Sequence, residues 1–210
     1  MQKIHRSSSQ HGLRLRVKQL AEYIADTGPC SAAVRRAMEG PYERIPSDFD
    51  SLRWGIEHGA MVRRCADELR ELGYAVYRED SNSFSVSLQR CGGVTLPAPV
   101  TLVGRPDIVA VGEDDVLVAD AKTGKESPAH QVQVLLYQLL LPLAPRTPYV
   151  DRVRALPVLG QVVYKQHPSV DLPAAAVETA FRQLVAEAVV RLVMEADPLP
   201  EPSARACRFC

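Results

Sequence analysis

Apolar residues recur at helical spacing in the N-terminal third of the chain. Residues 13–25 place apolar side chains three and four positions apart, and Asp-Thr-Gly-Pro at 26–29 ends that pattern. A short helix is predicted over 31–38, and a long one over about 48–72 with Gly73 as its stop. The apolar stripe predicted for the long helix consists of Ile56, Ala60, Met61, Ala66, Leu69 and Leu72.

The period of the pattern changes after the long helix. Short apolar runs alternate with turn residues, which is typical of strands joined as a meander. The runs are 74–78, 83–89, 94–103, 107–111 and 116–121. Strands that follow several helices favour a mixed architecture of packed layers. We therefore expect an α/β fold with a twisted central sheet.

Helical spacing returns in the C-terminal half. Ser127 and Pro128 have the character of a helix start, and the apolar pattern continues to Pro142. A loop is expected at 145–151, one or two strands at 155–165, and a last helix over about 172–195. The expected organisation is a single domain spanning 1–210. Residues 1–47 form its N-terminal helical part and residues 196–210 a cysteine-bearing tail.

Composition excludes several functional classes. The 210 residues include 25 basic and 25 acidic side chains, so the net charge attracts no polyanion and any nucleic-acid contact must be local. No stretch approaches the roughly 20 apolar residues that span a bilayer, and residues 1–12 lack an apolar core. A cytoplasmic protein without a membrane partner is expected.

Charged residues border two of the predicted strands in the sequence GRPDIVAVGEDDVLVADAKTGK, residues 104–125. Strand alternation places Asp120 and Lys122 on one face and turns Ala121 to the other. If residues 112–115 join the two strands as an antiparallel hairpin, Asp107 lies beside Asp120. Three charged groups then meet at one end of the sheet.

Two interpretations of this cluster are compatible with the pattern. Converging carboxylates are costly unless a cation neutralises them, and oxygen ligands suit Mg²⁺ or Mn²⁺. A neighbouring lysine can position or deprotonate a water for phosphodiester hydrolysis. The alternative is a surface ion pair, because the triplet Asp-x-Lys is common.

The order of these residues resembles the RecB-type branch of the PD-(D/E)xK nuclease superfamily. The resemblance rests on Pro106 and Asp107, on the segment Asp-Ala-Lys-Thr-Gly at 120–124, and on Gln133 and Tyr137 of the following helix. It implies a restriction-endonuclease-like core, with a central mixed β-sheet flanked by helices. It also implies that Asp107, Asp120 and the carbonyl of Ala121 bind the metal and that Lys122 positions or deprotonates the water. Gln133 and Tyr137 would support the lysine or the DNA backbone. Taken alone, these two residues are better explained as polar positions on a helix face turned to solvent.

A histidine in the long helix extends the resemblance. The family carries Gly-x-x-His ahead of its strands, and Gly55 with His58 matches that spacing here. The resemblance implies that His58 is a further metal ligand, which would favour Mn²⁺ because imidazole suits that ion better than Mg²⁺. Taken alone, a helical histidine is more often an ordinary surface or hydrogen-bonded residue.

Five cysteines do not form the paired framework of a secreted domain. Cys30, Cys207 and Cys210 are similar to the ligands of a four-iron, four-sulfur cluster in AddB-type nucleases and CRISPR adaptation exonucleases. The fourth ligand of that pattern is absent. A partner, Cys65 or Cys91 could complete the set, the chain could be truncated, or the terminal cysteines could be inert. On pattern alone Cys65 is a helix-packing residue and Cys91 a turn thiol.

The resemblance implies a metal-dependent DNA nuclease, and more narrowly an exonuclease acting on single-stranded DNA ends. A restriction or repair endonuclease and an inactive DNA-binding or assembly subunit are the alternatives. It further implies a partner from CRISPR adaptation or recombination. A strand-binding groove could use the pairs Arg35–Arg36 and Arg63–Arg64, although solvated helix faces explain these pairs equally well.

Overall fold

The structure is a computed structural model that describes residues 12–40 and 50–195. Its helices are α1 (Val17–Ile24), α2 (Ser31–Glu39), α3 (Ser51–Glu71), α4 (Pro128–Leu140), α5 (Val150–Ala155) and α6 (Thr179–Met194). Its strands are β1 (Leu13–Arg16), β2 (Ala75–Arg78), β3 (Phe84–Cys91), β4 (Val94–Gly104), β5 (Ile108–Val111), β6 (Val116–Lys122), β7 (Val158–Tyr164) and β8 (Val170–Leu172). Short 3₁₀ turns, η1 (Glu79–Asn82), η2 (Leu141–Leu143) and η3 (Ala174–Ala176), complete the described elements.

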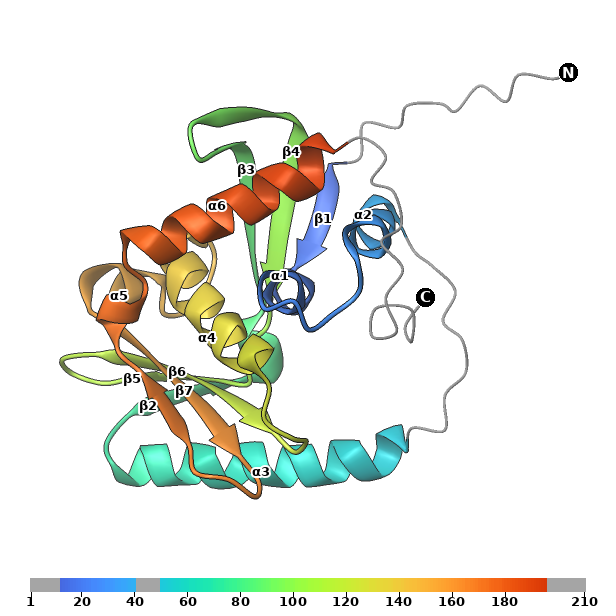
Figure 1. The fold of residues 1–210 in the computed structure, drawn as a ribbon. Coiled ribbons are helices and arrows are strands. Elements are labelled where there is room, and N and C mark those ends of the chain that lie inside the picture. The colour runs from blue at the N-terminus through green and yellow to red at the C-terminus, as the bar shows by residue number, and fades with distance from the viewer. Residues whose placement is uncertain (1–11, 41–49, 196–210) are drawn as a thin grey trace, which may run out of the picture.

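The strands form two sheets. The larger sheet has the order β2-β5-β6-β7-β8 and is mixed, because among its described strands the β6–β7 pair is parallel and the other pairs are antiparallel. The smaller sheet has the order β1-β4-β3. Helix α3 packs on one face of the larger sheet and α4 on the other (Figure 1). The predicted mixed sheet flanked by helices is thus confirmed.

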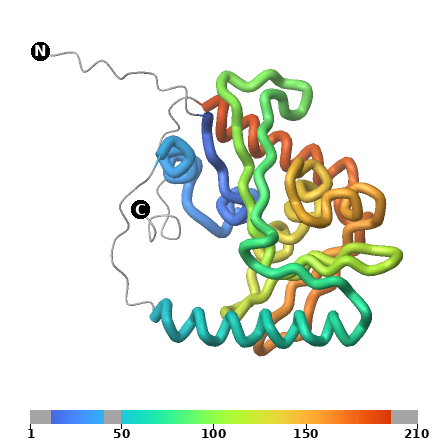
Figure 2. Tube along the Cα trace, turned by 180° about the vertical axis from the view of Figure 1, so that it is seen from behind, coloured from blue at the N-terminus to red at the C-terminus, as the bar shows by residue number. Residues whose placement is uncertain are grey.

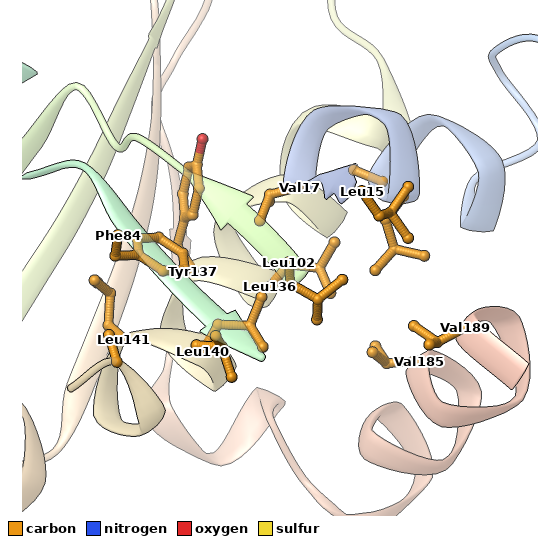
Figure 3. Packing of buried hydrophobic residues seen from close by; sticks show 14 of the residues in the cluster. Leu15, Val17, Phe84, Leu102, Leu136, Tyr137, Leu140, Leu141, Val185 and Val189 are labelled. Carbon is orange, nitrogen blue, oxygen red and sulfur yellow. The ribbon is translucent and has the colours of Figure 1, made fainter. Parts of the chain in front are cut away.

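Two hydrophobic clusters hold these layers together. The main core joins the inner face of the small sheet to α1, α4 and α6, with Leu15, Leu102, Leu136 and Val189 at its centre (Figure 3). A second cluster packs Met61, Val62, Cys65 and Ala66 of α3 against β5 and β6. Burial of this kind contributes roughly 25 cal/mol per Å² of apolar surface. The strand ends that carry the charged residues therefore lie between two packed layers.

The N-terminal segment differs from the helix predicted over 13–25. Residues 13–16 form β1, which pairs parallel to β4, and the helix begins only at Val17. Leu13 and Leu15 are buried while Arg14 and Arg16 are exposed, which is the two-residue period of a strand. The helical pattern that follows concealed this short alternation.

The predicted meander is also wrong in part. Strands β3 and β4 leave the larger sheet and pair with β1, so the chain returns to the larger sheet at β5 (Figure 2). In the long helix the stripe is shifted, because Ile56 and Leu72 are 64% and 75% exposed whereas Val62 and Cys65 are buried. Residues 150–155, expected in part as loop, form α5, and the last helix begins at Thr179 after β8. Within the described ranges no helix is long and apolar enough to cross a membrane.

Candidate active site

The β5–β6 hairpin brings the two predicted carboxylates together. Its antiparallel register runs from Ile108 opposite Ala119 to Val111 opposite Val116. Asp107 and Asp120 are the next residues at the open end of the hairpin. The prediction that an antiparallel pairing through residues 112–115 makes them neighbours is therefore confirmed.

Alternation along β6 sends its side chains to opposite layers. Ala119 and Ala121 belong to the cluster that packs on α3. Asp120 and Lys122 project to the other face, where both contact Gln133 of α4. The predicted common face of Asp120 and Lys122 is confirmed. Small alanines at the alternate positions allow α3 to pack closely beneath the charged pair.

Asp107 lies just before β5 and reaches around the end of the sheet. Its Oδ2 accepts a hydrogen bond of 2.8 Å from the backbone N–H of Ala121. Its Oδ1 lies 3.3 Å from Nε2 of His58. The imidazole in turn stacks on Trp54 of α3, with ring centroids 4.8 Å apart and planes 12° apart. Asp107 thus connects the long helix to the strand that carries Asp120.

Asp120, Lys122 and Gln133 form a compact polar cluster. Lys122 Nζ lies 2.5 Å from Asp120 Oδ2 and donates a 3.1 Å hydrogen bond to Gln133 Oε1. Gln133 Nε2 donates to Asp120 Oδ1 at 3.2 Å. The amide therefore contacts both ions at once, and it fixes the lysine ammonium beside the carboxylate.

Tyr137 extends the cluster one turn further along α4. Its hydroxyl accepts a 2.9 Å hydrogen bond from Gln133 Nε2 and donates to the carbonyl of Arg105 at 3.4 Å. Burial raises the pKa of the Tyr137 phenol well above its ordinary range, so the group stays neutral. Gln133 and Tyr137 lie on one face of the helix because they are four residues apart.

Burial sets the protonation behaviour of the site. Asp120 is 2% exposed, and desolvation raises the pKa of its carboxyl to about 6 even though the ammonium of Lys122 opposes the shift. The hydrogen bond to Asp107 raises the pKa of His58. Both groups therefore hold protons more tightly than they would in an unfolded chain.

The donor set is chemically suited to a divalent ion. Mg²⁺ is commonly held by one or two carboxylates while it keeps several waters, so Asp107 and Asp120 meet its requirement without a third side chain. Asp120 Oδ2 is buried and accepts no well-directed hydrogen bond from the described residues. Within those residues, no three His, Cys, Asp or Glu side chains are grouped closely enough to hold a metal. His58 is accordingly placed here as the hydrogen-bond partner of Asp107.

None of the described cysteines, Cys30, Cys65 and Cys91, forms a hydrogen bond with this cluster. Cys30 is the residue before α2 and is half-buried, while Cys207 and Cys210 lie outside the described residues. Cys65 is buried against β5 and β6, as expected for a packing residue. Cys91 ends β3 rather than occupying a turn, and its Sγ lies 3.9 Å from the carbonyl of Ala186.

The arginine pairs proposed for a strand-binding groove have different surroundings. Arg35 donates to the carbonyls of Leu192 and Val193 at the end of α6 and pairs with Glu39. It therefore ties α2 to α6. Arg36, Arg63 and Arg64 are exposed, and Arg64 lies 3.8 Å from Glu68. A structural role thus explains Arg35 better than a groove does.

Sequence reasoning missed two residues near the site. Asn82 is fully buried and donates hydrogen bonds to the carbonyls of Tyr77 and Pro106, which fixes the chain just ahead of Asp107. Glu22 of α1 lies within electrostatic reach of Lys122, and partial burial raises the pKa of its carboxyl. No motif marked either residue. The turn composition at 79–82 was the only available signal for Asn82.

The fold of this protein is similar to that of a solved structure. The solved structure of SSO0001 superposes with a TM-score of 0.56 at 12% sequence identity, over 98% of this chain and 86% of that one. At this identity the likeness concerns the fold alone. No curated protein matches the sequence.

The model of the PD-(D/E)XK nuclease superfamily matches residues 2–210, which is almost the whole chain. Nucleases of that superfamily typically use Mg²⁺ or Mn²⁺, and a DNA substrate is implied. By this match, the chain belongs to the PD-(D/E)XK nuclease superfamily.

Proposed function

We propose that this protein is a metal-dependent deoxyribonuclease of the RecB-like branch that degrades single-stranded DNA from its ends. The observation that carries the proposal is the convergence of Asp107, Asp120 and Lys122 at the open end of one hairpin. Family membership supports metal-dependent cleavage of DNA. The action on single strands and on ends is the narrower part of the proposal and rests on the resemblance in sequence.

Each side chain of the site has a distinct role in the proposed reaction. Asp107, Asp120 and the carbonyl of Ala121 would hold the divalent ion, which when bound neutralises charge on the phosphate and lowers the pKa of a nearby water. Lys122 is oriented by Gln133 and can position the water or hold the negative charge that develops on phosphate oxygens. The water's oxygen attacks phosphorus while the bond to the leaving nucleotide oxygen breaks. The proton released by the water is finally taken up by solvent or by the leaving oxygen.

His58 has a supporting role in this proposal. It contacts Asp107 at 3.3 Å and is held flat against Trp54. A histidine in that position can fix the orientation of the carboxylate, or bind the metal directly after a small rotation. Replacement of His58 by Gln keeps a hydrogen-bond donor but removes the imidazole. A metal preference that shifts from Mn²⁺ towards Mg²⁺ in that variant would support direct binding.

The preference for ends is tested with paired substrates. Linear and circular single-stranded DNA of the same sequence are incubated with the protein and Mn²⁺ or Mg²⁺. We expect degradation of the linear strand and persistence of the circle. Cleavage of both at equal rates would instead identify an endonuclease, which is the competing assignment. No cleavage of either would favour a DNA-binding or assembly subunit.

An iron-sulfur cluster is a separate part of the proposal. Cys30 lies half-buried beside α2, and the resemblance pairs it with Cys207, Cys210 and an unidentified fourth ligand. Burial raises the pKa of the thiols of Cys65 and Cys91, which makes both poor candidates for that fourth place. Anaerobically purified protein should absorb visible light, and Cys30→Ala should remove the absorption. The prediction of a CRISPR or recombination partner depends on the same cysteine pattern. A colourless wild-type protein would therefore weaken both the proposed cluster and the proposed partner.

A further inference from the structure

The outer face of the small sheet carries a row of basic and hydroxyl side chains. Along β1, Leu13 and Leu15 point into the core whereas Arg14 and Arg16 point outward. The strand register places Arg14 beside Thr101 and Arg16 beside Val103 of β4. Strand β3 continues these rows with Ser87 and Ser85. The outward face is therefore polar and positively charged at its β1 edge.

A groove of about 1010 Å³ runs along this face toward the candidate active site. Its basic lining residues are Arg14, Arg16, Lys18, Arg105 and Arg146, and among the described residues that line it none is acidic. At its inner end the lining includes Gln133 and Tyr137, which contact Asp120 and Arg105 respectively. The groove thus ends at the hydrogen-bond network that holds Lys122.

Most of the positive charge in the groove is not neutralised by neighbours. Lys18 lies 3.9 Å from Glu22, and Arg105 lies 2.9 Å from the exposed Asp80. The exposed pair of Arg105 with Asp80 is of a weak kind that exchanges readily, and the distance between Lys18 and the half-buried Glu22 is long for an ion pair. Arg14, Arg16 and Arg146 form no ion pair with any other residue of 12–40 or 50–195. Although the net charge of the whole chain is zero, the groove is locally cationic.

We propose that this groove binds the phosphate backbone of single-stranded DNA and delivers the strand to the metal centre. The inference rests on the proposed function and adds the path of the substrate to it. The groove wall leads directly to the site, because β4 ends at Gly104 and only Arg105 and Pro106 separate it from Asp107. Guanidinium groups are well suited to phosphate recognition because their donors match its oxygens.

Burial of the site favours a single strand over a duplex. Asp120 is 2% exposed and Gln133 is 7% exposed, and the side chains of Asp107 and Lys122 are 19% and 18% exposed. A flexible strand can lower one phosphate into such a recess. A stiff duplex would have to bend or open locally to bring a phosphate as deep, at a cost of a few kcal/mol.

The groove also predicts how the strand is recognised. Its aromatic residues, Phe84 and Tyr137, are 6% and 3% exposed, so their rings offer no open face for base stacking. Recognition then depends on phosphate contacts. Binding should be almost independent of base sequence and should weaken steeply with salt.

The test is DNA binding measured without catalysis. Fluorescence anisotropy of a labelled single-stranded oligonucleotide in EDTA compares wild type with Arg14→Glu/Arg16→Glu. Loss of two phosphate contacts should lower the slope of log K against log salt by about 1.4, which corresponds to roughly 25-fold weaker binding at 0.1 M salt. The matched control is Arg53→Glu/Arg70→Glu, which makes the same change in net charge on exposed positions of α3. We expect it to bind as wild type does.

Three results would overturn the inference. They are wild-type binding by the groove variant, equal weakening by the groove and α3 variants, and tighter binding of duplex than of single strand. Because β1 is a short edge strand, Arg146→Glu provides a second variant outside any strand, and it should weaken binding in the same direction. Arg14→Lys/Arg16→Lys keeps the charge and should restore most of the affinity.

The same variants separate this inference from the proposed function. Hydrolysis of bis(p-nitrophenyl) phosphate needs the metal centre but not the groove. If the protein hydrolyses this small diester and the groove variant retains that activity while losing DNA affinity, both proposals stand. If no substrate is hydrolysed but the groove variant still loses DNA affinity, the nuclease assignment fails and the DNA path survives.

Discussion

Gln133 contacts both the buried carboxylate and the lysine of the candidate active site. Its amide donates to Asp120 and Tyr137 and accepts from Lys122. Gln133→Ala would leave the buried Asp120 Oδ1 without its donor, which should cost about 1–3 kcal/mol of stability. It should also release the lysine and lower kcat by roughly 10- to 100-fold. Urea unfolding and DNA degradation assays measure the two effects.

Gln138 provides a matched control on the same helix. It is equally buried, but it donates to the carbonyls of Val158 and Leu172, away from the charged cluster. Gln138→Ala should destabilise the protein by a similar amount and leave kcat near the wild-type value at a temperature where the protein is folded. Equal losses of kcat in both variants would show that Gln133 acts only through stability.

Residue chemistry explains which parts of the site the sequence could predict. Asp107, Asp120 and Lys122 lie on one hairpin, so alternation and register alone bring them together. Gln133 enters the network because α4 packs on the same face of β6. Asn82 could not be predicted, because its partners are backbone carbonyls 5 and 24 positions away whose orientation depends on the fold.

Asn82 fixes the approach to β5 at the level of elements. The turn η1 crosses from the larger sheet to the smaller one, and the amide of Asn82 ties Tyr77 of β2 to Pro106 before β5. Asn82→Ala should destabilise the protein by about 1–3 kcal/mol through the unpaired carbonyls. It should also weaken metal binding, because the backbone that carries Asp107 would move. Isothermal titration with Mn²⁺ measures the second effect, and unchanged affinity in the folded variant would contradict this positioning role.

Close packing between the small sheet and α4 depends on Gly104. A Cβ at this position would lie 2.5 Å from two ring atoms of Phe84 and 2.9 Å from Tyr137. Gly104→Ala should therefore destabilise the protein by about 1–3 kcal/mol through overpacking. Gly124→Ala is the control, since a Cβ there meets no atom of residues 12–40 or 50–195 within 4 Å. Thermal unfolding should separate the two variants, and equal melting temperatures would refute the packing argument.

Element boundaries were harder to predict than element types. The alternation Leu-Arg-Leu-Arg at 13–16 is a strand signal, but it is four residues long and runs directly into the helical pattern of α1. Its strand character is decided by pairing with β4, almost ninety positions away. The separation of β3 and β4 into a second sheet is likewise a tertiary event. Local periodicity carries no information about such pairings.

The whole molecule should show a pH dependence that reflects its charged site. In the metal-free protein the pKa of Asp120 is raised from 3.8 to about 6, and that of His58 is raised above 6.5. Protons bound by these groups favour folding. The contribution from Asp120 is fully present below pH 3.8 and is lost as pH rises through about 6, and that from His58 is lost at higher pH. The free energy of unfolding of the wild type, relative to that of Asp120→Asn, should fall by up to about 3 kcal/mol between pH 4 and pH 7.

Metal binding should oppose the loss of stability that the metal-free protein shows as pH rises. The ligands must be deprotonated, so Mn²⁺ should raise the melting temperature more at pH 8 than at pH 5. Asp120→Asn should lose most of the increase at both pH values. A Mn²⁺-dependent increase that is the same in wild type and variant would place the metal elsewhere in the protein.

The most direct test of the central claim is degradation of labelled DNA with Mn²⁺ or Mg²⁺ by four proteins. They are wild type, Asp120→Ala, Lys122→Ala and Asp114→Ala, the last being a carboxylate in the exposed turn of the same hairpin. Wild type and Asp114→Ala should degrade DNA at similar rates, and EDTA should stop both. Asp120→Ala and Lys122→Ala should be slower by at least about 100-fold. Equal degradation by all four proteins would contradict the assignment of this hairpin as the active site.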